Sequence, residues 1–355
     1  MALRPLLRTG LAVVAISLAA NFLARLYHKP SAPMPALATT RGGFVQLAEG
    51  LPTKIDSDEL VRAGQERDDN VLGMIFCWCP PGAFSLGGGP RNPSGRYLDS
   101  NPVWVTLSRG FWMGKFEVTQ ADWQRVMGKT LAQQRAIDPG RPRPLGDGSK
   151  RPHAGEGPNY PIYFMNHDEA EEFCFRLTTT ERAAGRLEVG WVYCLPTEAQ
   201  WEFACRAGTT TATAFGNRLG SVQANFDGTE PFNNAPNGPY HHGVMPIGSY
   251  PANAWGLHDM HGNVWEWCRD HAKPQPMSGT HSFRGLTSSN RAFRGGCWYD
   301  KGPRCLSTAR AVGTVQSCGS GLGFRVALVS TELWKEANSV PQVPLQRHVE
   351  SQFEP

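Results

Sequence analysis

The chain of 355 residues has no C-x-x-C pair, no dense run of Lys or Arg and no internal repeat. Without cysteines at that spacing, a zinc site built from Cys pairs is unsupported. A formal net charge of only +4 without a basic cluster makes nucleic acid a poor candidate partner. No Lys follows the glycine run at 87–89, which favours a turn there over a phosphate-binding loop.

Glycine and proline are instead abundant. The 39 glycines and 28 prolines are about a fifth of the chain, against roughly 12% in average proteins. Their even spread predicts a compact domain rich in turns and short of long helices. Aromatic residues make up 10% of the chain, so enough apolar surface is available to form a core. The nine cysteines are odd in number and irregularly spaced, which leaves any disulfide pairing open.

The segment 1–30 has the composition of a signal peptide or an N-terminal membrane anchor. Arg4 and Arg8 precede an apolar stretch over 11–24, which ends at Arg25. The stretch is short for a spanning helix of ~20 residues, and a buried helix of the folded domain is a third interpretation. Signal and anchor both predict an exported chain, either secreted or periplasmic, or membrane-anchored facing outward with this segment in contact with the membrane.

The rest of the chain divides by composition. A Pro- and Ala-rich spacer is expected over 31–69, a folded domain over 70–330 and a polar, peripheral tail over 331–355. Within the domain, the stretches 129–160 and 209–255 are irregular and much longer than ordinary loops. Such lengths are typical of loops that bind a ligand or a metal.

Capping patterns predict three helices. One begins after Thr119 and ends near Gly128, a second begins after Asn166, and a third begins after Thr197 and ends at Gly208. In each case an acid or amide follows the capping residue three positions later, as in a capping box.

Seven stretches resemble, in order, the hallmark blocks of one family, the formylglycine-generating enzyme or sulfatase-modifying factor domain. The likeness spans roughly residues 70–330. The stretch YPIYFMNHDEAEEFCFRL, which contains the second predicted helix, corresponds to the family's P-V-x-x-V-S-W-x-x-A. The stretches are PPGAFSLGG, FWMGKFEVTQADWQRVMG, YPIYFMNHDEAEEFCFRL, LPTEAQWEFACRAG, GLHDMHGNVWEWCRD, RAFRGGCW and GLGFRVAL.

The resemblance implies an α+β fold of the formylglycine-generating enzyme type, related to C-type lectins. Such a fold is compact, low in regular secondary structure, built with long loops and stabilised by calcium. Some members oxidise a sulfatase cysteine to formylglycine with molecular oxygen and copper held by two cysteines. Others serve ergothioneine-type sulfur chemistry with an iron site in a helical domain, and others are non-catalytic modules.

The sulfur branch is not favoured, because its H-x-x-x-H-x-E iron motif is not found before residue 70. His258 and His261 form the close histidine pair, but a zinc site would need a further ligand. We therefore expect these two to be surface or core histidines.

The segment DMHGNVWEW is a candidate calcium loop. Asp259 and Glu266 offer hard oxygen ligands, and calcium takes 6 to 8 oxygens at spacings that such a loop can meet. The resemblance implies these two ligands together with the backbone carbonyls of Gly262 and Val264. The alternative is that Glu266 is a buried ion-pair partner between two tryptophans.

A second calcium site of the family would begin at Asn225 and Phe226. The Asp expected there falls near Pro239, so this chain has only part of that ligand set.

The segment RGGCWYDKGPRC, residues 294–305, corresponds to the family's catalytic loop. Oxidase members have copper-binding cysteines at the fourth and ninth positions after Arg-Gly-Gly, where this chain has Asp300 and Cys305. Cys297 stands where the oxidase has a Ser near its substrate. Because Cu(I) is soft and prefers thiolates, Asp300 is a poor substitute. Either Cys297 replaces the missing thiolate, or both cysteines are reduced loop residues or a structural disulfide.

The resemblance places Trp265, Gly321 and Arg325 at the substrate pocket. Gly321 replaces an active-site Asn of the family. The departures favour an exported or anchored, calcium-stabilised binding or accessory module with a protein or peptide partner. The alternative is a divergent oxidase, with copper as cofactor, that makes formylglycine in a sulfatase.

Overall fold

The computed structural model describes residues 61–88, 102–136, 155–271 and 290–338. The expected signal or anchor over 1–30 lies outside the described residues. Across the described ranges, none of the helices combines the length and the apolar character needed to cross a bilayer.

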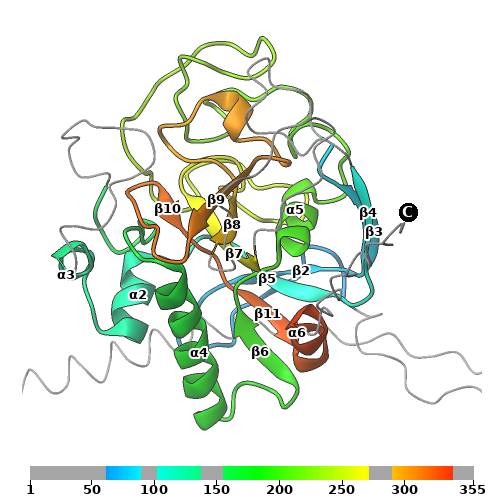
Figure 1. Cartoon of the computed structure of the whole chain (residues 1–355), viewed down its shortest axis with the longest axis vertical. Coiled ribbons are helices and arrows are strands. Elements are labelled where there is room, and N and C mark those ends of the chain that lie inside the picture. The colour runs from blue at the N-terminus through cyan, green and yellow to red at the C-terminus, as the bar shows by residue number, and fades with distance from the viewer. Residues whose placement is uncertain (1–60, 89–101, 137–154, 272–289, 339–355) are drawn as a thin grey trace, which may run out of the picture. The chain divides into compact units, whose positions relative to one another are not determined.

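The strands belong to three sheets (Figure 1). The five-stranded sheet is antiparallel and has the order β1 (Glu66–Arg67), β2 (Phe76–Cys79), β5 (Phe111–Gly114), β11 (Ala327–Ser330) and β6 (Trp191–Cys194). The four-stranded sheet has the order β10 (Leu322–Gly323), β7 (Trp265–His271), β8 (Asn290–Arg294) and β9 (Arg310–Thr314). The two-stranded sheet pairs β3 (Gly82–Leu86) with β4 (Val103–Leu107). Only the pairing of β10 with β7 is parallel among these described ladders.

The five-stranded sheet is covered on both faces. Phe76 and Trp78 of β2 join one hydrophobic cluster, whereas Cys77 and Cys79 join another. Successive side chains of a strand point to opposite faces, so all four residues of this short strand are buried.

The three predicted helix starts are confirmed. The capping boxes of Thr119, Asn166 and Thr197 open α2 (Gln120–Met127), α4 (His167–Ala183) and α5 (Glu198–Arg206). Helix α2 ends at Gly128 as expected, but the left-handed residue that ends α5 is Ala207, one residue before the expected Gly208. The other helices of the described ranges are α3 (Leu131–Ala136), α6 (Thr331–Asn338) and a 3-10 turn, Gly302–Arg304.

The folded part extends beyond the expected 70–330 at both ends. Strand β1 pairs with β2, so the last residues of the expected spacer 31–69 belong to the sheet. At the other end, α6 packs against β11 and β6, so the expected tail 331–355 begins as a helix joined to the fold. A two-residue strand is too short to leave a periodic pattern in the sequence.

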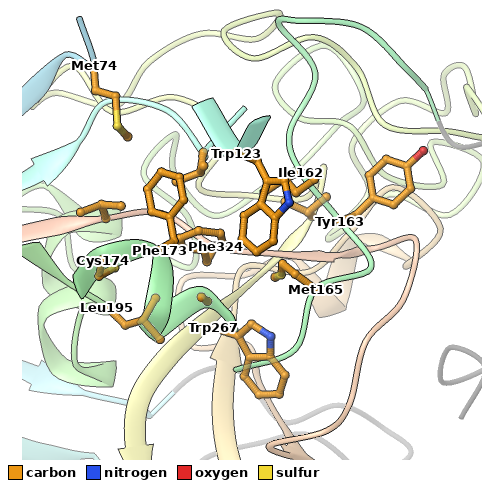
Figure 2. Close-up of a cluster of buried hydrophobic side chains, with 14 of the residues drawn as sticks. Met74, Trp123, Ile162, Tyr163, Met165, Phe173, Cys174, Leu195, Trp267 and Phe324 are labelled. Carbon is orange, nitrogen blue, oxygen red and sulfur yellow. The ribbon is translucent and has the colours of Figure 1, made fainter. Parts of the chain in front are cut away.

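The larger hydrophobic cluster lies between α2, α4 and the strands, and Figure 2 shows its aromatic centre. Trp123 of α2 stacks on Phe173 of α4 with 6.0 Å between ring centroids, and Phe324 meets Phe173 edge-on at 5.3 Å. Since Phe324 directly follows β10, this packing holds β10 against β7, whose first residues carry the expected site.

The stretch 209–255 is irregular, as expected, with isolated bridges in place of strands. It is nevertheless packed, because Leu219, Ala224 and Phe226 form a small hydrophobic cluster with Cys305. The irregular stretch therefore packs against the loop 294–305 through Cys305.

Candidate functional site

The segment that follows β8 folds back on itself through two glycines. Gly295 and Gly296 have φ values of +102° and +79°, which glycine adopts without strain. A Cβ on Gly296 would lie 2.4 Å from Cys305 Sγ and 2.6 Å from the carbonyl oxygen of Arg304. This close approach places Cys305 beside the start of the loop, near Cys297.

Asp300 is the centre of this loop, and its buried carboxylate is fully engaged. Its Oδ2 accepts hydrogen bonds from the indole N–H of Trp265 at 2.7 Å and from Cys297, through both the backbone N–H and the thiol, at 3.1 Å. Its Oδ1 lies 2.9 Å from Arg304 Nε in an ion pair. Burial raises the pKa of Asp300, and Arg304 acts against that rise.

Cys297 and Cys305 are both fully buried and not bonded to each other. All nine cysteines of the chain lie within the described ranges and are free thiols. Burial raises the pKa of both thiols well above the usual value, and the negative charge of Asp300 adds to the rise. A metal ion that binds these sulfurs would therefore have to displace their protons in a buried site next to a carboxylate.

Gly321 lies against Cys297 and leaves no room for a side chain. A Cβ there would be 2.6 Å from the ring of Tyr299 and 2.8 Å from Cys297 Sγ. The Tyr299 ring packs edge-on against Trp298 with a centroid distance of 4.9 Å. The space where the family has an Asn is thus filled by Tyr299 and the Cys297 sulfur.

Arg325 does not lie with the other two expected pocket residues. Its fully buried guanidinium makes two hydrogen bonds of 2.6 Å to Glu266 and one of 2.9 Å to each of the carbonyls of Gly114 and His258. A side chain so enclosed cannot meet a substrate. The structure therefore brings together Trp265, Gly321, Cys297, Asp300 and Cys305, and separates Arg325 from them.

Glu266, expected as a calcium ligand, is the partner of Arg325, and its Oε2 also accepts from the indole N–H of Trp201 at 2.6 Å. Asp259, with a left-handed φ of 58°, accepts a hydrogen bond of 2.7 Å from the backbone N–H of Gly248. Burial raises the pKa of Asp259 to about 6. Glu266 is thus a buried ion-pair partner, as the alternative interpretation of the sequence expected.

Glu117 joins this buried group and was not expected from the sequence. Its Oε1 accepts from the side-chain amide of Asn263 at 2.9 Å, and its Oε2 is buried with no hydrogen-bond partner among the described residues. Burial, followed by the charge of Asp259, raises the pKa of Glu117 well above its usual value. In the sequence, Glu117 stands two residues before the helix cap Thr119, and nothing in this local pattern indicates that its carboxylate is buried.

The two expected calcium segments touch. The backbone N–H of Asn263 donates to the carbonyl of Asn225 at 2.8 Å, and a Cβ on Gly262 would lie 2.2 Å from that oxygen. Asn225 Oδ1 is buried and has no partner among the described residues. Val264 and Phe226 are both fully buried beside them.

Glu117, Asp259 and Glu266 around the single guanidinium of Arg325, and two buried oxygens without donors, are the hard oxygen type that calcium prefers. The ligand atoms of the three acids are not gathered within 4.8 Å of one another, however, so these described residues do not form a closed ion site as they stand.

The two histidines hold backbone segments together, His261 in the interior and His258 at a partly buried position. His261 is buried, and its Nδ1 lies 2.7 Å from the carbonyl of Cys305 while its Nε2 accepts from Ala214 N–H at 3.1 Å. His258 Nδ1 lies 2.8 Å from the carbonyl of Tyr250. Because these nitrogens face different partners, the pair does not form a joint metal site.

Known proteins are similar to this chain in sequence and in fold. The formylglycine-generating enzyme of Mus musculus is 27% identical over 292 residues, covering 70% of this chain and 73% of that protein. The inactive C-alpha-formylglycine-generating enzyme 2 of Mus musculus is 33% identical over 141 residues, which cover 38% of this chain and less than half, 42%, of that protein.

Among solved structures, PvdO from Pseudomonas aeruginosa superposes with a TM-score of 0.54 at 22% identity, over 75% of this chain and 98% of that one. This likeness confirms the expected mixed fold. The sequence model of the sulfatase-modifying factor enzyme 1-like domain matches residues 62–329. The chain therefore belongs to the sulfatase-modifying factor enzyme 1-like family, in agreement with the resemblance of its seven sequence blocks.

Proposed function

We propose that this chain is a non-oxidase member of its family, a calcium-stabilised binding or accessory module that acts on a protein or peptide partner. The observation that carries the proposal is the engagement of Asp300. Its carboxylate contacts Arg304, Trp265 and Cys297, so it is already used where an oxidase needs a metal-binding thiolate.

The chemistry of copper supports the same conclusion. Cu(I) prefers two soft thiolates, and a carboxylate paired with a guanidinium is neither soft nor available. The remaining thiols of Cys297 and Cys305 are buried beside a negative charge that disfavours their ionisation. The relative named as an inactive enzyme supports the existence of family members without the oxidase reaction.

Reconstitution with copper tests the proposal. The metal-free full chain is titrated with Cu(I) against a chelator, then given oxygen, a reductant and a peptide with the sulfatase-type Cys-x-Pro-x-Arg motif. We expect weak copper binding and an unchanged peptide mass. A loss of sulfur from the peptide cysteine would overturn the proposal.

The variant Asp300→Cys identifies the cause. It restores the family spacing of two thiols, so we expect its Cu(I) affinity to rise sharply over the native chain. Lys301→Cys is the matched control, because it adds a thiol to the same loop at an exposed position. Equal and tight binding by the native chain and Asp300→Cys would mean that Cys297 already serves as the second ligand.

That last outcome describes the second candidate function, a divergent oxidase that converts a sulfatase cysteine to formylglycine. The observation in its favour is that the Gly296 turn brings Cys305 close to the Cys297 segment. A sulfatase is the partner implied by this reading.

We also propose that the chain is exported, either secreted or held by its N-terminal segment. The support is the Arg4 and Arg8 region before an apolar stretch. Fractionation of a tagged chain with added protease checks this, and a protease-protected cytosolic domain would contradict it.

A further inference from the structure

The first residue of α4, His167, departs from its family and has a buried nitrogen without a hydrogen-bond partner among the described residues. It stands where the family's helix motif P-V-x-x-V-S-W-x-x-A has Trp. Its side chain is 0% exposed and meets the ring of Trp267 edge-on, with centroids 5.4 Å apart. Trp267 belongs to the aromatic cluster of Figure 2.

The hydrogen bonds of His167 assign the roles of its two ring nitrogens. Nε2 lies 3.2 Å from the backbone carbonyl of Cys268 on β7, so this nitrogen carries the proton and donates it. Nδ1 is buried and has no hydrogen-bond partner among the described residues, so it presents a lone pair. A metal-binding histidine usually has this arrangement, with its second nitrogen donating to a carbonyl.

Two carboxylates lie in front of that lone pair. Asp168 Oδ1 is 3.9 Å and Glu171 Oε2 is 4.0 Å from His167 Nδ1. The ligand atoms of His167, Asp168 and Glu171 all lie within 4.8 Å of one another. In the described part of the chain, no other set of three His, Cys, Asp or Glu side chains is gathered so closely. Around a tetrahedral zinc ion, neighbouring ligand atoms are about 3.3 Å apart.

The group can close to that distance at little cost. The side chains of Asp168 and Glu171 are 60% and 54% exposed, so they rotate without disturbing the core. Asp168 Oδ2 has only a long contact of 3.4 Å with the side-chain amide of Gln316. His167 is fixed from behind by Cys268 and Trp267, so the acids move to it.

Positive charge nearby selects the kind of ion. Arg291, Arg269 and His271 act electrostatically on Glu171, Arg291 and His271 also act on His167, and the helix N-terminus adds a partial positive charge. This positive charge repels any cation, so a bound ion must be stabilised by a strong bond to the imidazole nitrogen. Zinc forms such a bond, whereas calcium and magnesium prefer oxygen ligands.

We propose that His167 Nδ1, Asp168 and Glu171 form a binding site for a divalent transition-metal ion of the zinc type. Three protein ligands leave a coordination position open on the solvent side, where the two acids are exposed. Through Nε2 and the Cys268 carbonyl, the bound ion fastens the start of α4 to β7. The site is separate from the Cys297 loop and does not depend on the function proposed for it.

Zinc titration of the metal-free full chain against a chromophoric chelator tests the proposal, with Co²⁺ absorption as a second probe. We expect one zinc equivalent to be lost, or its affinity to fall at least tenfold, in Asp168→Asn and in Glu171→Gln. Both replacements are exposed and nearly isosteric, so the fold is retained. Glu172→Gln is the matched control, since Glu172 pairs with Arg176 on the outer surface and its loss leaves zinc binding unchanged.

A third variant separates metal binding from packing. His167→Trp restores the family residue, so it fills the buried position but offers no ligand, and we expect a folded chain without this zinc equivalent. Failure of the native chain to bind zinc at ~100 µM would overturn the proposal. Zinc affinity that is the same in the native chain, Asp168→Asn and Glu171→Gln would overturn it as well.

Discussion

The two buried acidic regions of this protein both contain carboxylates and arginine, but they differ in how many of their buried oxygens have hydrogen-bond donors. In the Cys297–Cys305 loop, Asp300 has an arginine, an indole and a thiol around its carboxylate. Around Arg325, three acids share a single guanidinium, and Glu117 Oε2 and Asn225 Oδ1 have no donor among the described residues. Buried polar atoms almost always have partners. The first region is therefore complete within the chain, whereas the second keeps buried oxygens for which the described residues supply no donor.

The comparison also explains why a single substitution could change the first region. Replacing a copper-binding Cys with Asp introduces a charge that must be compensated inside the core. Arg304 and Trp265 supply that compensation here. Under the proposed non-oxidase function, this region holds an internal ion pair where the oxidases of the family hold copper.

The largest expected effect comes from removing the central cation of the second region. Arg325→Met leaves Glu266 buried without its ion-pair partner, so we expect a loss of about 3–5 kcal/mol in unfolding free energy. Arg304→Met is the matched change in the first region. Arg304 is partly exposed and Asp300 keeps three other donor groups, on Trp265 and Cys297, so we expect a loss of roughly 1 kcal/mol.

Urea unfolding of both variants measures the difference. Equal losses would contradict the distinction between the two regions, because they would mean that both carboxylates depend on arginine to the same extent.

The next effect concerns calcium, which only the second region should bind. At 100 times its dissociation constant, calcium should add about 2.7 kcal/mol to the folded state, because the ion binds the folded chain alone. Thermal unfolding with calcium and with a chelator measures the shift. Asp259→Asn should remove it, whereas Asp168→Asn, in the site on α4, should keep it. A midpoint that does not respond to the chelator would rule out a calcium site here.

The smallest effect tests how tightly the first region is filled. Gly321→Ala adds a Cβ at 2.6 Å from Tyr299 and 2.8 Å from Cys297, so we expect a loss of about 1–3 kcal/mol. Gly220→Ala is the control, because its nearest neighbour is an ordinary 3.6 Å away. Combining Gly321→Ala with Tyr299→Leu should recover part of the loss. A neutral Gly321→Ala would show that the loop has free space for the family's Asn.

The sequence predicted what depends on neighbouring residues. The caps at Thr119, Asn166 and Thr197 are local hydrogen bonds within four residues, so their patterns were sufficient to place three helix starts. The proximity of Cys297, Asp300 and Cys305 followed from their short separation. The left-handed Ala207 was missed because glycine is the usual residue in that conformation and Gly208 is adjacent.

Contacts between distant segments could not be predicted in the same way. The pairing of Glu266 with Arg325 spans 59 residues and that of Glu117 with Asn263 spans 146. Nothing in the local pattern of FEVT distinguishes a buried acid from an exposed one. Strand β1 was missed for a related reason, since its two residues are strand only through their pairing with β2.

The nine free thiols would impose an order of events on folding in the oxidising medium that the proposed export implies. Each is buried in the folded chain, so an oxidant reaches them only before the fold has closed. A newly made chain in an oxidising medium must therefore finish folding before its sulfurs are joined at random. The speed of folding, rather than the strength of any cross-link, then decides how much of the protein matures correctly.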